Sequence, residues 1–206
     1  MGKAVLLPVH PKWLEKICHK VGVNDDGSPV YEKGDEIRKN RPKEKVPFRV
    51  YLYCTKPKTK HDWGLCLENG DVGLVCNCNY DDAIRNGMKI LSGKVIGEFI
   101  CDDITKIIKC GSRFVAEGST EAETNRIARS SCLDFDDMKK YLGAKDGYAW
   151  HISNLVIYDE PKELNEFRGN PCNAVLDIQE SCTSCGKCGL KRPPQSWCYV
   201  EGVETK

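Results

Sequence analysis

Apolar residues recur with two different periods along this 206-residue chain, and these periods predict mostly strands with a few helices. The apolar run over residues 4–9 predicts a buried strand, and residues 11–21 follow with the spacing of a short helix. Residues 48–54 alternate strictly, which predicts a half-buried strand. On this pattern Tyr51 and Tyr53 lie on the more exposed face of that strand.

The remaining segments continue this mixture of strands, turns and helices. Asn69-Gly70 separates two short apolar runs and predicts a hairpin turn. Gly97 interrupts the strand predicted over 94–101 and marks a bulge or a close approach. The other expected elements are an acidic helical segment over 117–142 ended by Gly143, a strand over 148–159, a short helix from Pro161 and a last strand over 196–201.

This order of elements predicts a mainly β protein with helices, of the α+β class. The strands around 48–54, 94–101 and 149–158 are expected in one curved sheet or barrel, with 117–142 as a peripheral helical insertion. We expect residues 1–169 to form one domain. Residues 170–206 are expected to form a cysteine-rich knuckle and a final strand that pack on the same domain.

Cysteine usage predicts a metal site near the C-terminus. There are 13 cysteines, an odd number, so reduced thiols with a metal site explain the count better than a disulfide framework. The four candidate ligands are Cys182, Cys185, Cys188 and Cys198, in a C-x2-C-x2-C run with a fourth thiol after nine residues. This donor set favours a structural zinc, with an iron–sulfur cluster as the alternative and Cys172 as a reserve ligand.

Most other cysteines are expected to be small buried side chains, among them Cys18, Cys54 and Cys101. Cys76 and Cys78 are either a second ligand pair or buried thiols, and the pattern favours buried thiols. The chain has no run of 18 apolar residues and no signal-peptide pattern at its start, so we expect a cytoplasmic protein without a membrane partner.

Charge is concentrated in one segment although the whole chain carries a net charge of only +1. Residues 33–60 hold ten Lys or Arg and three acids, which is net +7. Such a segment attracts phosphates, and Tyr51 and Tyr53 would stack bases. The candidate nucleic-acid contacts are Lys33, Arg38, Lys39, Arg41, Tyr51 and Tyr53, and the alternative is a solvated loop.

Lys33 and Arg38, together with Glu36, also carry a family resemblance. Lys33, Glu36 and Arg38 follow the first predicted helix in a pattern similar to the ASCH signature G-x-K-x-x-E-x-R, although Tyr31 occupies the position of the leading glycine. The segment GKVIGEFIC resembles the second core strand of the same family, and YAWHISNLVIYDEPKEL resembles its closing strand and helix. The resemblance covers most of residues 3–167.

The resemblance implies a PUA-like β-barrel that binds RNA or a nucleotide in a basic cleft. It also implies an alternative, because some ASCH members look like amidohydrolases that act on acylated nucleosides. The catalytic candidates would then be Lys33, Glu36 and Glu98, although those members carry threonine at the position of Glu36. A second alternative is a protein-interaction module that uses the acidic segment 117–142. Lys33 and Glu98 meeting in a closed pocket would favour the enzyme.

Overall fold

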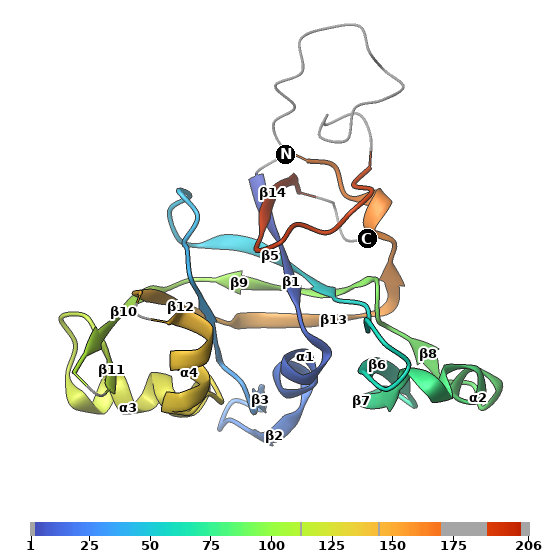
Figure 1. Cartoon of the computed structure of the whole chain (residues 1–206), viewed down its shortest axis with the longest axis horizontal. Coiled ribbons are helices and arrows are strands. Elements are labelled where there is room, and N and C mark those ends of the chain that lie inside the picture. The colour runs from blue at the N-terminus through green and yellow to red at the C-terminus, as the bar shows by residue number, and fades with distance from the viewer. Residues whose placement is uncertain (1–2, 112, 144, 170–188, 203–206) are drawn as a thin grey trace, which may run out of the picture. The chain divides into compact units, whose positions relative to one another are not determined.

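The structure is a computed structural model that describes residues 3–111, 113–143, 145–169 and 189–202 (Figure 1). It divides into two compact units. The first unit comprises Met1–Glu15, Arg49–Phe99 and Leu155–Lys206, and the second comprises Lys16–Phe48 and Ile100–Asn154. None of the helices in the described ranges is long and apolar enough to cross a membrane.

The main sheet of the first unit has five strands in the order β13-β9-β5-β1-β14. Strand β1 pairs in parallel with β5 and antiparallel with β14. The strands are β1 (Lys3–Val9), β5 (Phe48–Cys54), β9 (Val95–Cys101), β13 (Ser153–Lys162) and β14 (Cys198–Glu201). Helix α1 (Pro11–Cys18) follows β1 directly and buries Leu14 and Ile17, as the helical spacing predicts.

Strand β5 is buried on both of its faces, which corrects the prediction of a half-buried strand. Tyr51 is 0% exposed and Tyr53 is 3% exposed, and both lie in a core cluster with Leu6 and Phe167. The ring centroids of Tyr51 and Phe167 are 4.9 Å apart. The alternating pattern did not predict this burial. The aromatic side chains of the predicted outer face are covered by residues that follow β13 in the chain.

A smaller three-stranded sheet of the first unit confirms the predicted hairpin. Strands β6 (Trp63–Glu68) and β7 (Asp71–Cys76) pair antiparallel, with β8 (Lys89–Ile90) on the other side of β6. Asn69 and Gly70 connect them with φ values of 51° and 90°. Both residues occupy the left-handed region that a two-residue hairpin turn requires. The 3-10 helix η1 (Asn77–Asn79) and helix α2 (Tyr80–Arg85) follow β7.

The second unit combines a four-stranded sheet with two helices. Its strands, in the order β11-β10-β12-β4, are β11 (Arg113–Ala116), β10 (Ile104–Cys110), β12 (Gly147–His151) and β4 (Asp35–Arg38). A separate hairpin consists of β2 (Lys20–Val23) and β3 (Pro29–Tyr31). Helices α3 (Glu121–Ser130) and α4 (Phe135–Leu142) bury Ile127, Met138 and Leu142 in one core with residues of the sheet.

Helices α3 and α4 lie within the segment 117–142, for which the sequence predicts an acidic helical insertion ended by Gly143. Thr120 and Asp134 accept hydrogen bonds from backbone amides in the first turns of α3 and α4, and Gly143 ends α4 with a φ of 70°. The insertion supplies much of the core of the second unit, because its apolar side chains pack on β10 and β11.

Three expectations about the strands are corrected. The described residues form open sheets and no closed barrel, because β13 and β14 remain the two edges of the five-stranded sheet. The strand expected over 148–159 is two strands, β12 and β13, which belong to different sheets. The helix expected from Pro161 is shorter: β13 continues to Lys162, and a 3-10 helix, η2 (Leu164–Glu166), follows. The α+β class itself is confirmed.

Candidate functional site

The signature residues of the second unit form a buried charged network. Lys33 is 1% exposed, Glu36 is 5% and Arg38 is 8%. The Lys33 amine lies 3.4 Å from one carboxylate oxygen of Glu36, and the Arg38 guanidinium lies 3.4 Å from the other. The Lys33 amine also donates to the backbone carbonyl of Ser131. The three residues therefore form one network in which a single carboxylate faces two cations.

Local backbone pairing explains why these side chains are buried. The amide of Lys33 donates to the carbonyl of Lys16 at 3.1 Å, and the amide of Gly34 donates to the carbonyl of Ser130 at 2.9 Å. Glu36 then pairs with Trp150 in the β4–β12 register. Lys33 is thus fixed between the end of α1 and the end of α3, and all four residues of β4 are buried.

Asp35 belongs to the same strand and was not among the residues that the sequence singled out. It is 1% exposed and accepts a hydrogen bond from Arg126 at 3.0 Å and another from Ser130. His151 lies opposite Asp35 in the strand register and contacts Asp102 at 2.7 Å. No local pattern could have identified Asp35, because its partners come from helix α3, about 90 residues further along the chain.

The cations that follow β4 are exposed. Lys39, Arg41, Lys43 and Lys45 are all at the surface, and Glu44 is the single acid among them. The Lys39 amine lies over the ring of Tyr141 at 5.1 Å from its centroid. Four cations and one acid give residues 39–45 a net charge of +3. We call this segment the basic loop.

Glu98 lies in the first unit with two partners. It is 8% exposed, its carboxylate lies 3.1 Å from the Arg49 guanidinium, and Tyr158 donates its hydroxyl proton to it at 2.6 Å. Burial and the bond to Glu98 raise the pKa of Tyr158 above its usual range. Sequence reasoning missed Tyr158. Because Lys33 belongs to the other unit, its convergence with Glu98 stays a prediction.

The two tyrosines proposed to stack bases do not expose their rings. Tyr51 and Tyr53 lie in the core of the first unit, so neither presents a ring face to a single-stranded nucleic acid in this structure. Burial raises the pKa of Tyr53. The sequence pattern placed both residues correctly on one face of β5 but could not show that this face is covered.

The predicted zinc ligands fall mostly outside the described residues. Cys182, Cys185, Cys188 and the reserve ligand Cys172 are in the range 170–188. Cys198 is described: it is half-buried on β14, opposite Leu6 in the strand register, and packs against the core of the first unit. Within the residues that the structure does describe, no cluster of three or more His, Cys, Asp or Glu could hold a metal ion.

Among the other described cysteines are several buried thiols and one pair, while Cys110 is exposed and Cys132 is half-buried. Cys18, Cys54 and Cys101 are buried, as expected, and burial raises the pKa of Cys54 and of Cys101 to about 12. Cys76 and Cys78 form a disulfide, and Cys78 is exposed. The expectation of buried thiols at these two positions was therefore wrong, because β7 ends at Cys76 and the chain turns into a surface 3-10 helix.

Comparisons with known proteins give matches at the level of structure. No protein-family profile matches the chain, and no curated protein matches it significantly. The chain is similar to a crystal structure titled ASCH from Zymomonas mobilis, with 14% identity over 96% of this chain and 87% of that one and a TM-score of 0.43. A serine-to-alanine mutant of that protein gives 14% identity over 96% and 88%, with a TM-score of 0.49. A tyrosine-to-phenylalanine mutant gives 15% identity over 79% and 77%, with a TM-score of 0.44. The solved structures found in this way carry the name of the same family, ASCH, that the Lys33–Arg38 signature resembles.

Proposed function

We propose that this chain is an RNA- or nucleotide-binding module of the PUA-like kind, and that the basic loop of the second unit makes the main phosphate contacts. The observation that carries the proposal is the exposure of Lys39, Arg41, Lys43 and Lys45 within seven residues, against the single acid Glu44. Closely spaced exposed cations release counterions from a phosphate backbone, which is the main source of sequence-independent affinity.

The buried network has a positioning role in this proposal. Arg38 and Lys33 face Glu36 and are almost fully buried, so they are poorly placed to meet a ligand directly. They fix the end of β4, from which the basic loop starts. We therefore keep Lys39 and Arg41 as ligand contacts and assign Lys33 and Arg38 to holding the strand.

Fluorescence anisotropy with a labelled single-stranded 12-nucleotide RNA tests the proposal. The variant carries Lys39, Arg41, Lys43 and Lys45 changed to Ala, and affinity is measured from low to high salt. Each lost phosphate contact reduces the slope of log K against log salt by about 0.7 for a single strand, so we expect a slope lower by about 2–3.

A matched control distinguishes the effect of the basic loop from the effect of losing positive charge in general. Changing Lys20, Lys109, Lys140 and Lys145 to Ala removes the same charge from exposed positions of the same unit. The control should keep most of the affinity and the salt slope. Equal losses in both variants would show a general charge effect and refute the basic loop as the binding surface.

The amidohydrolase alternative rests on the burial of two titratable residues, Lys33 and Glu98, since buried ionisable groups gather at functional sites. In this alternative Lys33 acts as base or nucleophile and Glu36 or Glu98 positions water. Turnover of an acylated cytidine, abolished by Lys33→Met in a protein that still folds, would support it. Absence of turnover by the wild-type protein would leave RNA or nucleotide binding as the function.

We also propose a structural zinc held by Cys182, Cys185, Cys188 and Cys198. The observation that supports it is the position of Cys198 on β14, where a bound metal would tie the cysteine-rich segment to the five-stranded sheet. Elemental analysis should find one zinc per chain, and changing Cys182 and Cys185 to Ser should release it and lower thermal stability. Stoichiometric iron with visible absorbance would identify the iron–sulfur alternative instead.

A further inference from the structure

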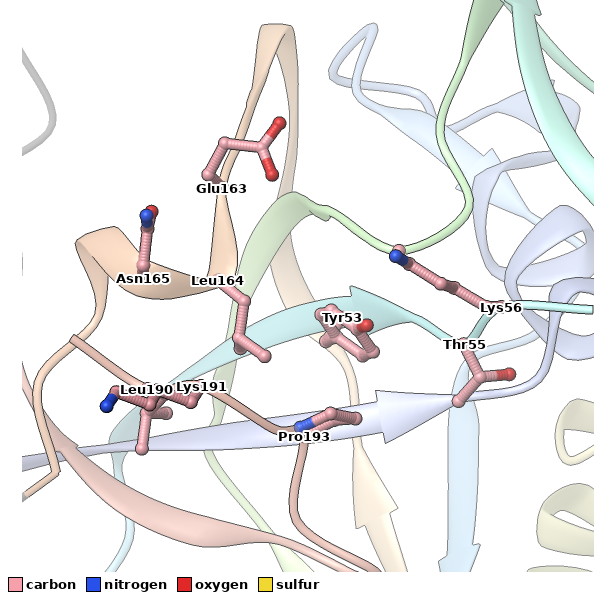
Figure 2. A pocket seen from close by; sticks show the side chains of 10 residues that line it. Tyr53, Thr55, Lys56, Glu163, Leu164, Asn165, Leu190, Lys191 and Pro193 are labelled. Atoms are coloured by element: carbon pink, nitrogen blue, oxygen red, sulfur yellow. The ribbon is translucent and has the colours of Figure 1, made fainter. Parts of the chain in front are cut away.

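A second candidate site lies within the first unit, at the end of β5. Here the surface of the chain forms an open cavity of about 620 Å³, within the size range of sites for small organic ligands. Four separate stretches of the first unit form it, around residues 53–56, 93, 163–165 and 190–193 (Figure 2). The lining residues are Tyr53, Thr55, Lys56, Gly93, Glu163, Leu164, Asn165, Leu190, Lys191 and Pro193.

This cavity is distinct from the predicted catalytic residue of the same unit. The amide of Cys54 donates to the carbonyl of Lys94 at 2.9 Å, so β5 and β9 lie side by side here, with residues 53–56 next to 93 and 94. Arg49 and Glu98 form their ion pair further back along the same two strands. Residues 49 and 53 are four positions apart on β5, which places the ion pair about 13 Å along the strand from the cavity.

The walls combine apolar and polar groups. Leu190 is half-buried and Pro193 is exposed, and these two side chains form the accessible apolar part of the wall, with the buried Tyr53 and Leu164 behind it (Figure 2). Asn165 adds a side-chain amide at the rim. A flat apolar body could therefore cover this surface with one of its faces, while polar groups remain in reach at its edge.

The lining of the cavity has a net positive charge, because its carboxylate forms an ion pair with a neighbouring lysine. Glu163 is the only carboxylate of the lining, and the Lys94 amine lies 3.1 Å from it. Lys56 and Lys191 stand on opposite sides of the cavity, and the Lys56 side chain passes next to Gly93 (Figure 2). Because Lys94 balances the charge of Glu163, a lysine of the lining can pair with a bound anionic group.

Gly93 leaves room for the Lys56 side chain. Gly93 has a φ of +91°, and a Cβ built on it would lie 2.3 Å from Cε of Lys56 and 3.0 Å from its Cγ. The lysine side chain therefore passes directly over the glycine. Any larger residue at position 93 would displace it, so the glycine gives Lys56 its path into the cavity.

We propose that this cavity binds a small organic anion whose flat apolar body lies against Leu190 and Pro193 and whose phosphate or carboxylate meets Lys56. Nucleoside monophosphates and aromatic carboxylates share this chemistry. The site is independent of the proposed RNA binding, because the cavity lies in the first unit and the basic loop lies in the second.

Isothermal titration calorimetry and ¹⁵N chemical-shift mapping test the site with AMP and with indole-3-acetate. Adenosine and inorganic phosphate are the comparison probes, since each carries only half of the required chemistry. We expect one or both of the anionic ring compounds to bind, with shifts at residues 53–56 and 163–165. Adenosine and phosphate should bind at least about tenfold more weakly, because each lacks either the charge or the ring.

Two variants make the test specific to Lys56. Lys56→Met keeps the stem over Gly93 and removes the amine, so affinity should fall at least about tenfold, the size of a lost charge-assisted hydrogen bond. Gly93→Ala keeps the charge but displaces the side chain, and it should weaken binding in the same direction. Lys58→Met, in the same loop and outside the lining, is the matched control and should bind normally.

The outcomes are separable from those of the RNA experiment. The quadruple variant of the basic loop should bind the small anion as the wild type does. Tighter binding of AMP identifies a nucleotide site, and tighter binding of indole-3-acetate identifies a carboxylate site; either supports the shared chemistry. Failure of both probes to bind at millimolar concentration, or binding that Lys56→Met leaves unchanged, overturns the proposal.

Discussion

Replacing Glu36 by Gln tests whether the buried network holds the second unit together. The substitution keeps the size of the side chain and removes the one carboxylate that contacts both Lys33 and Arg38 at 3.4 Å. All three residues are at most 8% exposed, so water cannot easily replace the lost charge. Two cations then remain buried without this counter-charge.

The magnitude follows from the distances and from the burial. At an effective dielectric constant of about 20, each contact at this distance is worth about 4–5 kcal/mol before the cost of desolvation is subtracted. The Gln amide oxygen still accepts a hydrogen bond, and burying Gln costs less than burying a carboxylate. Removing one partner of a buried ion pair typically costs about 3–5 kcal/mol, and we expect a loss of this size in the free energy of unfolding.

Guanidinium unfolding followed by tryptophan fluorescence and by circular dichroism measures the loss. Trp150 is 0% exposed and lies opposite Glu36 in the β4–β12 register, so its emission reports on this part of the sheet. Glu117→Gln is the control, because Glu117 pairs with Lys106 at 2.8 Å on the exposed surface of the same unit. If Glu36→Gln loses no more stability than Glu117→Gln, the network is not buried as described and the reasoning fails.

Three further predictions concern single positions. Gly97→Ala should destabilise the first unit by about 3 kcal/mol, because a Cβ at this position would lie 2.4 Å from the backbone carbonyl oxygen of Val156. Thermal or chemical unfolding measures the loss, and an unchanged midpoint would contradict this contact. Asp134→Ala should cost about 1 kcal/mol by removing the N-cap of α4, whereas Asp136→Ala, in the same first turn, should cost less. Hydrogen bonds from the amides of residues 59 and 58 lower the pKa of Asp62 in the folded state below its ordinary value of 3.8. The ionised Asp62 therefore contributes its full stabilisation of the fold above pH 3.8, and this contribution is lost as the pH falls through the lower folded pKa. A carboxyl titration followed by NMR that gives Asp62 an ordinary pKa would refute the last of these.

The sequence by itself determined the elements whose cause is local. Asn69-Gly70 forms the hairpin turn because both residues tolerate positive φ, and Gly143 ends α4 for the same reason. The spacing of Leu14 and Ile17 defined helix α1. The close approach at Gly97 could also be predicted, because a glycine in an apolar strand usually marks such a contact.

Only the tertiary structure decided which side chains are covered and which residues meet. Tyr51 and Tyr53 are buried although their strand alternates, because residues distant in the sequence cover the second face of β5. The single strand expected over 148–159 divides at Ile152 between two sheets, since pairing partners and not local propensity decide where a strand ends.

The same distinction applies to the candidate sites. The motif around Glu36 was visible in the sequence, but its burial and its contact with Ser131 depend on helix α3, which comes almost 100 residues later. The cavity at Lys56 had no sequence signature at all, because its walls come from four stretches separated by many residues. Burial and long-range contacts are properties of the folded chain, and a one-dimensional pattern records only the local preferences that are compatible with them.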